Sequence, residues 1–262
     1  MGDIELVRVE RREGGVGMLV LNRPERLNAI STATAAVLSE GVADLAADDR
    51  VGAIVVAGEG RSFCAGADVS ELETLDGPPE FSAFVHRLTD AFGALASCPK
   101  PSVAARHGSV LGGGLELALA CDLRVADETA RLGVPEVKLG LLPGASGTAR
   151  LPRLVPRSVA KQLLMTGEAL SADDAHRLGL VNEVVAGGMA LDAALALATT
   201  LAGLPPLALA AAKRLVDEGA ALPMDAAITL ERETVSMLFG TDDRQEGLRA
   251  FREKRPPSFK GT

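Results

Sequence analysis

Glu116 follows three consecutive glycines, Gly112 to Gly114, in a run that is otherwise leucine and alanine (LGGGLELALA, 111–120). A helix that is apolar all round is typical of a buried helix. An ionised carboxylate buried without a partner costs several kcal/mol, whereas an acid in the first helical turn gains only about 0.3–1 kcal/mol from the helix dipole. Two readings therefore stay open for Glu116: a satisfied structural acid, or a group that carries out chemistry.

The three glycines point to a ligand. They precede the helix, so their amides face out of its N-terminus, and without side chains they allow close approach to the backbone. Tight packing against a neighbouring strand would demand glycine equally well. Exposed amides beside a buried carboxylate indicate an oxyanion hole next to a general acid or base.

A second small-residue loop has the same character. It runs from Gly60 to Leu72 (GRSFCAGADVSEL), and Ala65 to Ala67 stand at its centre. Asp68 is placed to cap the helix that follows. Two such loops, each after a strand and before a helix, could each aim one N–H at the same oxygen. Taken alone, this loop is more typical of an ordinary turn.

A third stretch, VPEVKLGLLPGASGTARL (134–151), holds a second acid, Glu136, directly after a proline. Taken alone, Glu136 is more typical of a surface acid. Pro143-Gly144 precede a further helix start, which Ser146 or Thr148 could cap. Gly-Ala-Ser-Gly does not match the G-x-S-x-G pattern, so a nucleophilic serine is not indicated.

The elements that must position these groups follow from hydrophobic periodicity and turn residues. Gly14 and Gly15 join the first two strands, and this GGVG run opens no helix, so it is not a dinucleotide fingerprint. The predicted strands are 4–10, 16–22, 51–58, 101–108, 122–127, 130–137 and 181–185. The predicted helices are 29–47, 68–74, 80–97, the one after Gly114, 146–153, 157–166, 171–178, 189–204, 207–218, 224–239 and 242–254. The pattern predicts an αβ core over 1–195 and a helical region over 196–262, which we expect to mediate oligomerisation.

Composition excludes several classes of protein. The 262 residues carry a net charge of −8, which argues against nucleic acid as a partner. The N-terminus lacks a signal-peptide layout, and no apolar run reaches the roughly 18 residues that span a bilayer. The absence of tyrosine excludes a short-chain dehydrogenase, which needs a catalytic tyrosine.

Neither the cysteines nor the histidines form a recognisable site. Cys64, Cys98 and Cys121 match no metal-ligand spacing, and their odd number argues against a disulfide framework. We expect three small core residues in a reducing cytoplasm. The histidines stand alone in the sequence, without a ligand or nucleophile motif; they are His86, His107 and His176.

Taken together, these motifs resemble the crotonase family, the enoyl-CoA hydratases and isomerases. The matching stretches, in chain order, are LNRPERLNAI (21–30), SFCAGADVSEL (62–72), GGGLELALACDLRVA (112–126), PEVKLGLLPGASGTARLPRLV (135–155) and AFREKRPPSF (250–259). The resemblance covers essentially the whole chain. It implies an α/β fold, a right-handed spiral of ββα turns with a helical C-terminal region that builds trimers and usually a dimer of trimers.

The resemblance also implies roles for individual residues. The backbone N–H groups of Ala67 and Gly113 correspond to the oxyanion hole for a thioester carbonyl, Glu116 and Glu136 to the two catalytic acids, and the Gly144 amide to a contact of the attacking water. It further implies CoA contacts at Arg26, Ala65, Ala67 and Asp68. No metal is implied, and no cofactor beyond the CoA of the substrate itself.

The implied reaction is the syn addition of water to a trans-2-enoyl-CoA. Both acids are present, which favours a hydratase, because isomerases of the family commonly lose the acid at the Glu116 position. A Δ3,Δ2-enoyl-CoA isomerase, another enolate-forming acyl-CoA enzyme and a non-catalytic acyl-CoA binder remain alternatives. The chain departs from the family at Ser70 (often lysine), Ala149 (often glutamine) and Arg106-His107 (usually small or apolar).

Overall fold

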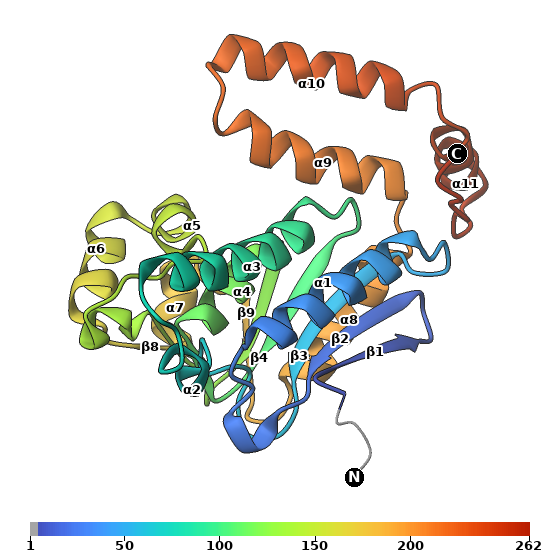
Figure 1. Ribbon diagram of the computed structural model, residues 1–262. Helices are drawn as coiled ribbons and strands as arrows, with labels where there is room; N and C mark the ends of the chain where they lie inside the picture. The colour runs from blue at the N-terminus through green and yellow to red at the C-terminus, as the bar shows by residue number, and fades with distance from the viewer. Residues whose placement is uncertain (1–4) are drawn as a thin grey trace.

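The fold is built on a mixed six-stranded sheet (Figure 1), seen in a computed structural model that describes residues 5–262. Its strand order is β1-β2-β3-β4-β6-β9, in which only the β1–β2 hairpin is antiparallel. The strands are β1 (Val7–Arg12), β2 (Val16–Leu21), β3 (Ala53–Gly58), β4 (Ser102–Arg106), β6 (Leu123–Asp127) and β9 (Glu183–Val185). This arrangement, together with the helices that cover it, confirms the predicted α/β class.

Helices cover both faces of this sheet, which explains the continuous apolar run of β3. Ile54 and Val56 face a core shared with α1 (Thr32–Ala47), α3 (Pro78–Ser97) and α4 (Gly113–Ala120). Val55 faces the opposite core, which α8 (Ala190–Ala202) closes. The catalytic candidates all lie on the side of α3 and α4.

A second, three-stranded sheet brings distant segments together. Its order is β5-β7-β8, with β5 parallel to β7, and its strands are β5 (Ser109–Leu111), β7 (Arg131–Gly133) and β8 (Leu170–Ser171). Leu111 pairs with Gly133, so the chain leaves β5 toward α4 and leaves β7 toward the next segment at the same end of this sheet. The Gly112 amide donates to the Gly133 carbonyl at 2.9 Å, which ties the two exits together.

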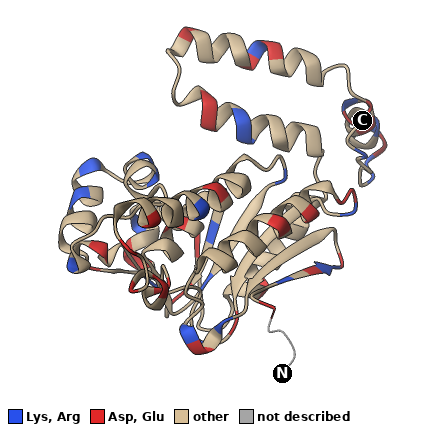
Figure 2. Ribbon diagram, in the orientation of Figure 1, with Lys and Arg blue, Asp and Glu red and all other residues tan. Residues whose placement is uncertain are grey.

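The remaining helices are a set of short helices and a helical arm. The short ones are η1 (Pro24–Arg26), α2 (Val69–Leu72), η2 (Pro135–Leu139), α5 (Gly147–Leu154), α6 (Arg157–Thr166) and α7 (Ala172–Arg177). The arm consists of α9 (Pro206–Gly219), α10 (Met224–Leu238) and α11 (Asp242–Glu253), and it extends from the body of the molecule (Figure 1). Charged residues are scattered along both parts of the chain (Figure 2).

No single helix in residues 5–262 has the length and apolar character to cross a bilayer. Helices α8 and α9 reach that length only together, and they meet at an angle of 110°. Because α8 packs on the sheet through Ala194 and Ala198, the predicted boundary between residues 195 and 196 falls inside a core helix. The division of the chain into two regions stays a prediction.

Most predicted elements are confirmed, with ends shifted by a few residues, and one is wrong in part. The first strand begins at Val7, while Ile4 of the predicted range lies outside the described residues. The predicted strand 130–137 ends at Gly133, because Pro135 has no N–H for a ladder and instead opens the 3-10 helix η2. The short strands β5 and β8 were not predicted.

One buried charge is poorly satisfied. Arg106 at the end of β4 is fully buried, and its Nε and Nη1 have no hydrogen-bond partner among the described residues. Its Nη2 donates only a long 3.5 Å contact to the Leu180 carbonyl, which Arg124 already occupies at 3.0 Å. Burial, followed by the charge of Arg124, lowers the pKa of Arg106 well below its usual value.

Arg106→Met is therefore expected to stabilise the fold. Replacing buried charge by an apolar side chain of similar volume should raise the free energy of unfolding by about 1–4 kcal/mol, measured by urea denaturation. Arg124→Met serves as the matched control and should destabilise, because Arg124 also satisfies the Cys121 carbonyl at 2.8 Å. A less stable Arg106→Met variant would contradict this reading.

Candidate active site

A cavity of about 100 Å³ collects the residues that the sequence singled out. Glu116, Glu136, Ala67, Gly113 and Gly144 all line it, and so does Ala65. They come from α4, η2, the loop before α2 and the loop before α5. Segments separated by up to about eighty residues thus meet at one site, on the edge where α4 and η2 leave the small sheet.

The glycines at the start of α4 serve both of the purposes that the sequence left open. Gly112 has φ +51° and ψ −125°, and a Cβ there would lie 2.6 Å from Glu136 Oε1. A Cβ on Gly114 would lie 2.4 Å from the Cys64 carbonyl oxygen. Gly112 therefore admits the carboxylate of Glu136, and Gly114 permits close packing of α4 on the neighbouring segment.

The amides of Ala67 and Gly113 lie side by side. A Cβ built on Gly113 would be 3.4 Å from the Ala67 nitrogen, and one on Gly66 would be 3.6 Å from the Gly113 nitrogen. A parallel bridge from Cys64 to Val110 ties the two segments together, and a second bridge from Ile30 to Ala67 holds the Ala67 loop against the residues before α1. Within residues 5–262 neither amide donates to a protein acceptor, so both N–H groups are free to bind a ligand.

Glu116 is buried, with 3% of its surface exposed, and backbone amides hold it. The Gly147 N–H donates to its Oε1 at 2.6 Å, and the nearby Ala145 amide also favours the carboxylate. Burial raises the pKa of Glu116 to about 7, with a further increase from the charge of Glu136 and an opposing effect from these amides. Both protonation states are accessible near neutral pH, as acid–base catalysis requires.

Glu136 is half-buried at the second position of η2, rather than on the surface as its isolated sequence context indicates. Its Oε2 is buried and has no hydrogen-bond partner among the described residues. Burial also raises the pKa of this carboxyl group. A buried acid without a partner is a frequent mark of a functional site.

Two site residues were missed by sequence reasoning. The Gly147 amide donates to Glu116, and the Ala145 amide favours the Glu116 carboxylate; both residues follow closely after the predicted Gly144. A Cβ on Gly147 would lie 2.9 Å from Glu116 Oε1 and 2.7 Å from Pro143. The Gly-Ala-Ser-Gly run was the available signal, since a glycine there marks a close approach to another group.

The predicted CoA contacts divide into two groups. Ala65 and Ala67 line the cavity, whereas Arg26 is exposed in η1 and does not line it. Asp68 caps α2 as predicted, by accepting from the Ser70 amide at 3.1 Å, and pairs with Arg23 at 2.8 Å. Burial opposes ionisation of Asp68, but Arg23 and the amides of Ser70 and Glu71 keep the Asp68 pKa below its ordinary value. CoA contacts at Arg26 and Asp68 stay predictions.

The profile of the enoyl-CoA hydratase/isomerase family matches residues 11–262. The chain belongs to this family. The resemblance that the sequence motifs carry is thereby confirmed, and so is the fold, because family members of known structure superpose on it throughout.

The chain is 40% identical to a human protein named enoyl-CoA hydratase domain-containing protein 2, mitochondrial, over 99% of this chain and 90% of that one. It is 39% identical to the 2,3-dehydroadipyl-CoA hydratase of Escherichia coli, over 95% and 97% of the two chains. The crystal structure of an enoyl-CoA hydratase from Bacillus anthracis matches with a TM-score of 0.95 at 34% identity, over 98% of this chain and all of that one.

Removing the charge of Glu136 is expected to lower the pKa of Glu116 below about 7, because that charge disfavours the Glu116 carboxylate. The measurement is an infrared titration of the carboxyl bands in Glu136→Gln and in the unaltered protein. Glu183→Gln, an exposed change on β9, is the control and should leave the midpoint in place. An unchanged or higher Glu116 midpoint in Glu136→Gln would show that the two carboxyl groups do not interact.

Proposed function

We propose that this chain is an enoyl-CoA hydratase, a hydro-lyase that adds water to a trans-2-enoyl-CoA and releases a 3-hydroxyacyl-CoA. The observation that carries the proposal is the meeting of Glu116 and Glu136 in one cavity, beside the adjacent amides of Ala67 and Gly113. Hydration requires two proton transfers and one developing negative charge, and the cavity offers a group for each.

The mechanism we propose assigns these groups to the reaction. The amides of Ala67 and Gly113 donate to the thioester oxygen, where negative charge develops as the enolate forms, so they lower the barrier. Glu116 removes a proton from water as its oxygen bonds to C3, and Glu136 delivers a proton to C2 on the same face. The Gly144 amide helps to hold the water. In dehydration the two acids exchange roles.

A double-bond isomerase is the runner-up within the family. It moves one proton between C2 and C4 and needs only one acid, for which Glu136 would suffice. The Gly147 amide, however, holds Glu116 in the cavity by a hydrogen bond. Burying this second acid costs desolvation free energy, which is consistent with a role in catalysis and so favours hydration over isomerisation.

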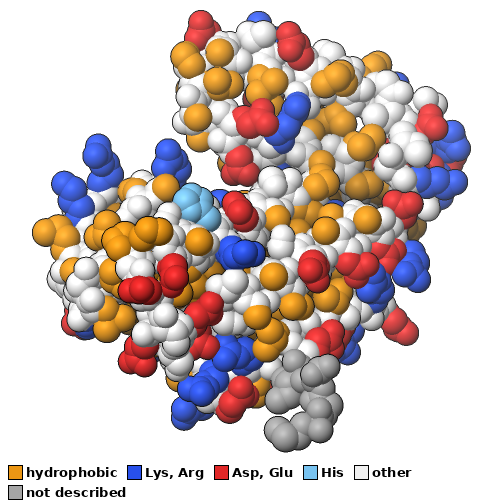
Figure 3. Space-filling view, viewed as in Figure 1, with side chains coloured by type: hydrophobic (Ala, Val, Ile, Leu, Met, Phe, Trp, Pro, Cys, Tyr) orange, Lys and Arg blue, Asp and Glu red, His pale blue; other side chains and the backbone are white. Residues whose placement is uncertain are grey.

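We also propose a homotrimer or a dimer of trimers, built through the helical arm. Its support is the set of large apolar side chains that the arm exposes: Val216, Met224, Val235, Met237, Phe239 and Phe251. Figure 3 shows such side chains on the arm, above the hollow that separates it from the body. A cytoplasmic location, for which the three buried free thiols are the support, and a role in fatty-acid β-oxidation complete the proposal.

The proposed acyl group is uncharged. Among the described residues, the side chains that line the cavity are apolar apart from the two acids; those from α3 are Phe81, Phe84, Val85 and Leu88, and those near α5 are Leu139, Leu141 and Leu142. No lysine, arginine or histidine joins them within residues 5–262. A second carboxylate at the end of the acyl chain would thus be desolvated without a partner and next to two acids.

The proposed activity is tested by mixing the protein with trans-2-enoyl-CoA substrates of four to twelve carbons and following the conjugated thioester absorbance. We expect the absorbance to fall. Glu116→Gln and Glu136→Gln should each lower kcat by about 10²-fold or more, while circular dichroism remains unchanged. A 3-enoyl-CoA that gains conjugation faster than any 2-enoyl-CoA loses it would identify an isomerase, and binding without turnover would identify a binder.

A glycine pair provides a matched control for the same assay. Gly112→Ala should lower activity strongly, because the new Cβ would collide with Glu136 Oε1. Gly93→Ala in the middle of α3 should leave activity unchanged, since a Cβ there meets nothing within 4 Å. Equal effects of the two substitutions would contradict the claim that Gly112 is needed to admit the Glu136 carboxylate.

Substrate charge gives a separate prediction. A six-carbon 2-enoyl-CoA with a methyl end should be hydrated with a kcat/KM at least about 10²-fold higher than the same chain ending in a carboxylate. The E. coli 2,3-dehydroadipyl-CoA hydratase, assayed in parallel, serves as the reference that accepts the charged chain. Equal kcat/KM values for the two substrates with this protein would overturn the proposed acyl class.

A further inference from the structure

Ser146, in the loop before α5, has an unusual backbone conformation. Its φ is 86° and its ψ is 5°, in the left-handed region that residues with a side chain rarely adopt. It occupies the N-cap position of α5, yet its hydroxyl makes no capping hydrogen bond. The N-cap residues Ser31 and Thr241, with extended backbones, do cap their helices. The strain at Ser146 is therefore not compensated by the usual cap.

The conformation does determine where the next amide points. Ser146 directly precedes Gly147, whose N–H donates to Glu116, and it follows Ala145, whose amide also favours the Glu116 carboxylate. The peptide that joins Ser146 to Gly147 carries the Gly147 N–H, so its orientation follows from the ψ of Ser146. The Ser146 carbonyl also accepts from the Arg150 amide at 2.8 Å, which fixes this peptide on the first turn of α5.

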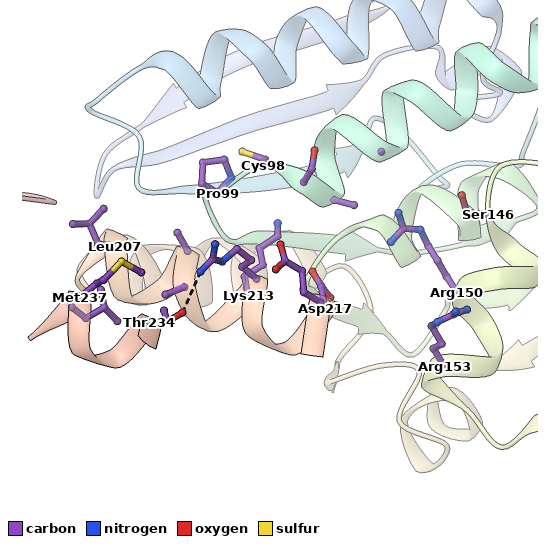
Figure 4. A pocket seen from close by; sticks show the side chains of 18 of the residues that line it. Cys98, Pro99, Ser146, Arg150, Arg153, Leu207, Lys213, Asp217, Thr234 and Met237 are labelled. Carbon is purple, nitrogen blue, oxygen red and sulfur yellow. Dashed lines mark hydrogen bonds between the residues drawn. The ribbon is translucent and has the colours of Figure 1, made fainter. Parts of the chain in front are cut away.

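The side chain of Ser146 faces away from the catalytic cavity. It lines a groove of about 940 Å³ between α5, the end of α3 and the arm, together with Arg150 and Lys213. Figure 4 shows Ser146 at the α5 side of this groove, across from Lys213 and Asp217 of α9. Ser146 does not line the cavity of Glu116, so the structure leaves its backbone as the route by which it acts there.

We propose that Ser146 is a positioning residue whose left-handed backbone aims the Gly147 amide at Glu116 and so holds that carboxyl group in its catalytic orientation. The kinetic part of the test rests on the proposed hydratase activity. The charged group that faces Glu116 is Glu136 on η2, while α3 presents only apolar side chains to the cavity and Arg150 of α5 lines the groove. Loss of the Gly147 donor would disfavour the carboxylate and raise the pKa of Glu116.

Four substitutions separate the backbone from the hydroxyl. Glycine and asparagine tolerate the left-handed region, whereas the β-branched threonine and valine do not. Ser146→Gly and Ser146→Asn should keep the acidic limb of the kcat profile at the position of the unaltered protein. Ser146→Thr and Ser146→Val should move this limb to higher pH by about one unit and lower kcat on it about tenfold, with KM changed less. Ala149→Val, an exposed change in the same helix, is the control for introducing a β-branched side chain.

The outcome depends on the order of the variants. A higher kcat on the acidic limb for Ser146→Asn than for Ser146→Thr supports the proposal. A higher kcat for Ser146→Thr than for Ser146→Asn would mean that the hydroxyl group matters. Equal pH profiles for all four variants would mean that the backbone conformation does not matter. Either result overturns the proposal. An infrared titration needs no substrate and should give a higher pKa for Glu116 in Ser146→Thr than in Ser146→Asn. A failure of the proposed activity can therefore be told apart from a failure of this proposal. If valine prevents folding, the asparagine and threonine variants alone decide the result.

Discussion

The burial of one carboxyl group against main-chain amides is the interaction on which the rest of this structure depends. Glu116 lies in a helix without a polar neighbour of its own; its hydrogen bond comes from the Gly147 amide, 31 residues further along the chain, and the Ala145 amide also favours its carboxylate. Those amides offset part of the desolvation cost without cancelling it, so the pKa of Glu116 stays near 7. A charged partner such as arginine would have stabilised the carboxylate more and removed its use as a base.

The topology supplies the second carboxyl group. Because β5 and β7 are parallel and in register at Leu111 and Gly133, the chain leaves both strands at one edge. One exit becomes α4 with Glu116, and the other becomes η2 with Glu136. The positive φ and missing Cβ of Gly112 then admit the Glu136 carboxylate beside the start of α4. The pairing of Leu111 with Gly133, together with Gly112, thus determines the spacing of two acids that lie twenty residues apart.

Local signals in the sequence were sufficient for most elements, whereas the candidate site residues were assembled only through the resemblance of several motifs to one family. The apolar run of β3 indicated a strand buried on both faces, and the apolar surroundings of Glu116 indicated a buried acid. The cavity position of Glu136 could not be derived in this way, because it depends on the pairing of β5 with β7, and β5 is only three residues long. The Gly147 contact and the conformation of Ser146 depend likewise on tertiary packing, which leaves no periodic pattern.

The central claim is that one thioester oxygen is held by the amides of Ala67 and Gly113 while both acids face the β-carbon. A crystal structure with butyryl-CoA, a saturated thioester that cannot be hydrated, tests it most directly. We expect the thioester oxygen within about 2.7–3.1 Å of both amide nitrogens, and the acyl β-carbon between the carboxyl groups of Glu116 and Glu136. A thioester oxygen that contacts only one of the two amides, or either carboxyl group turned away from the acyl chain, would contradict the account.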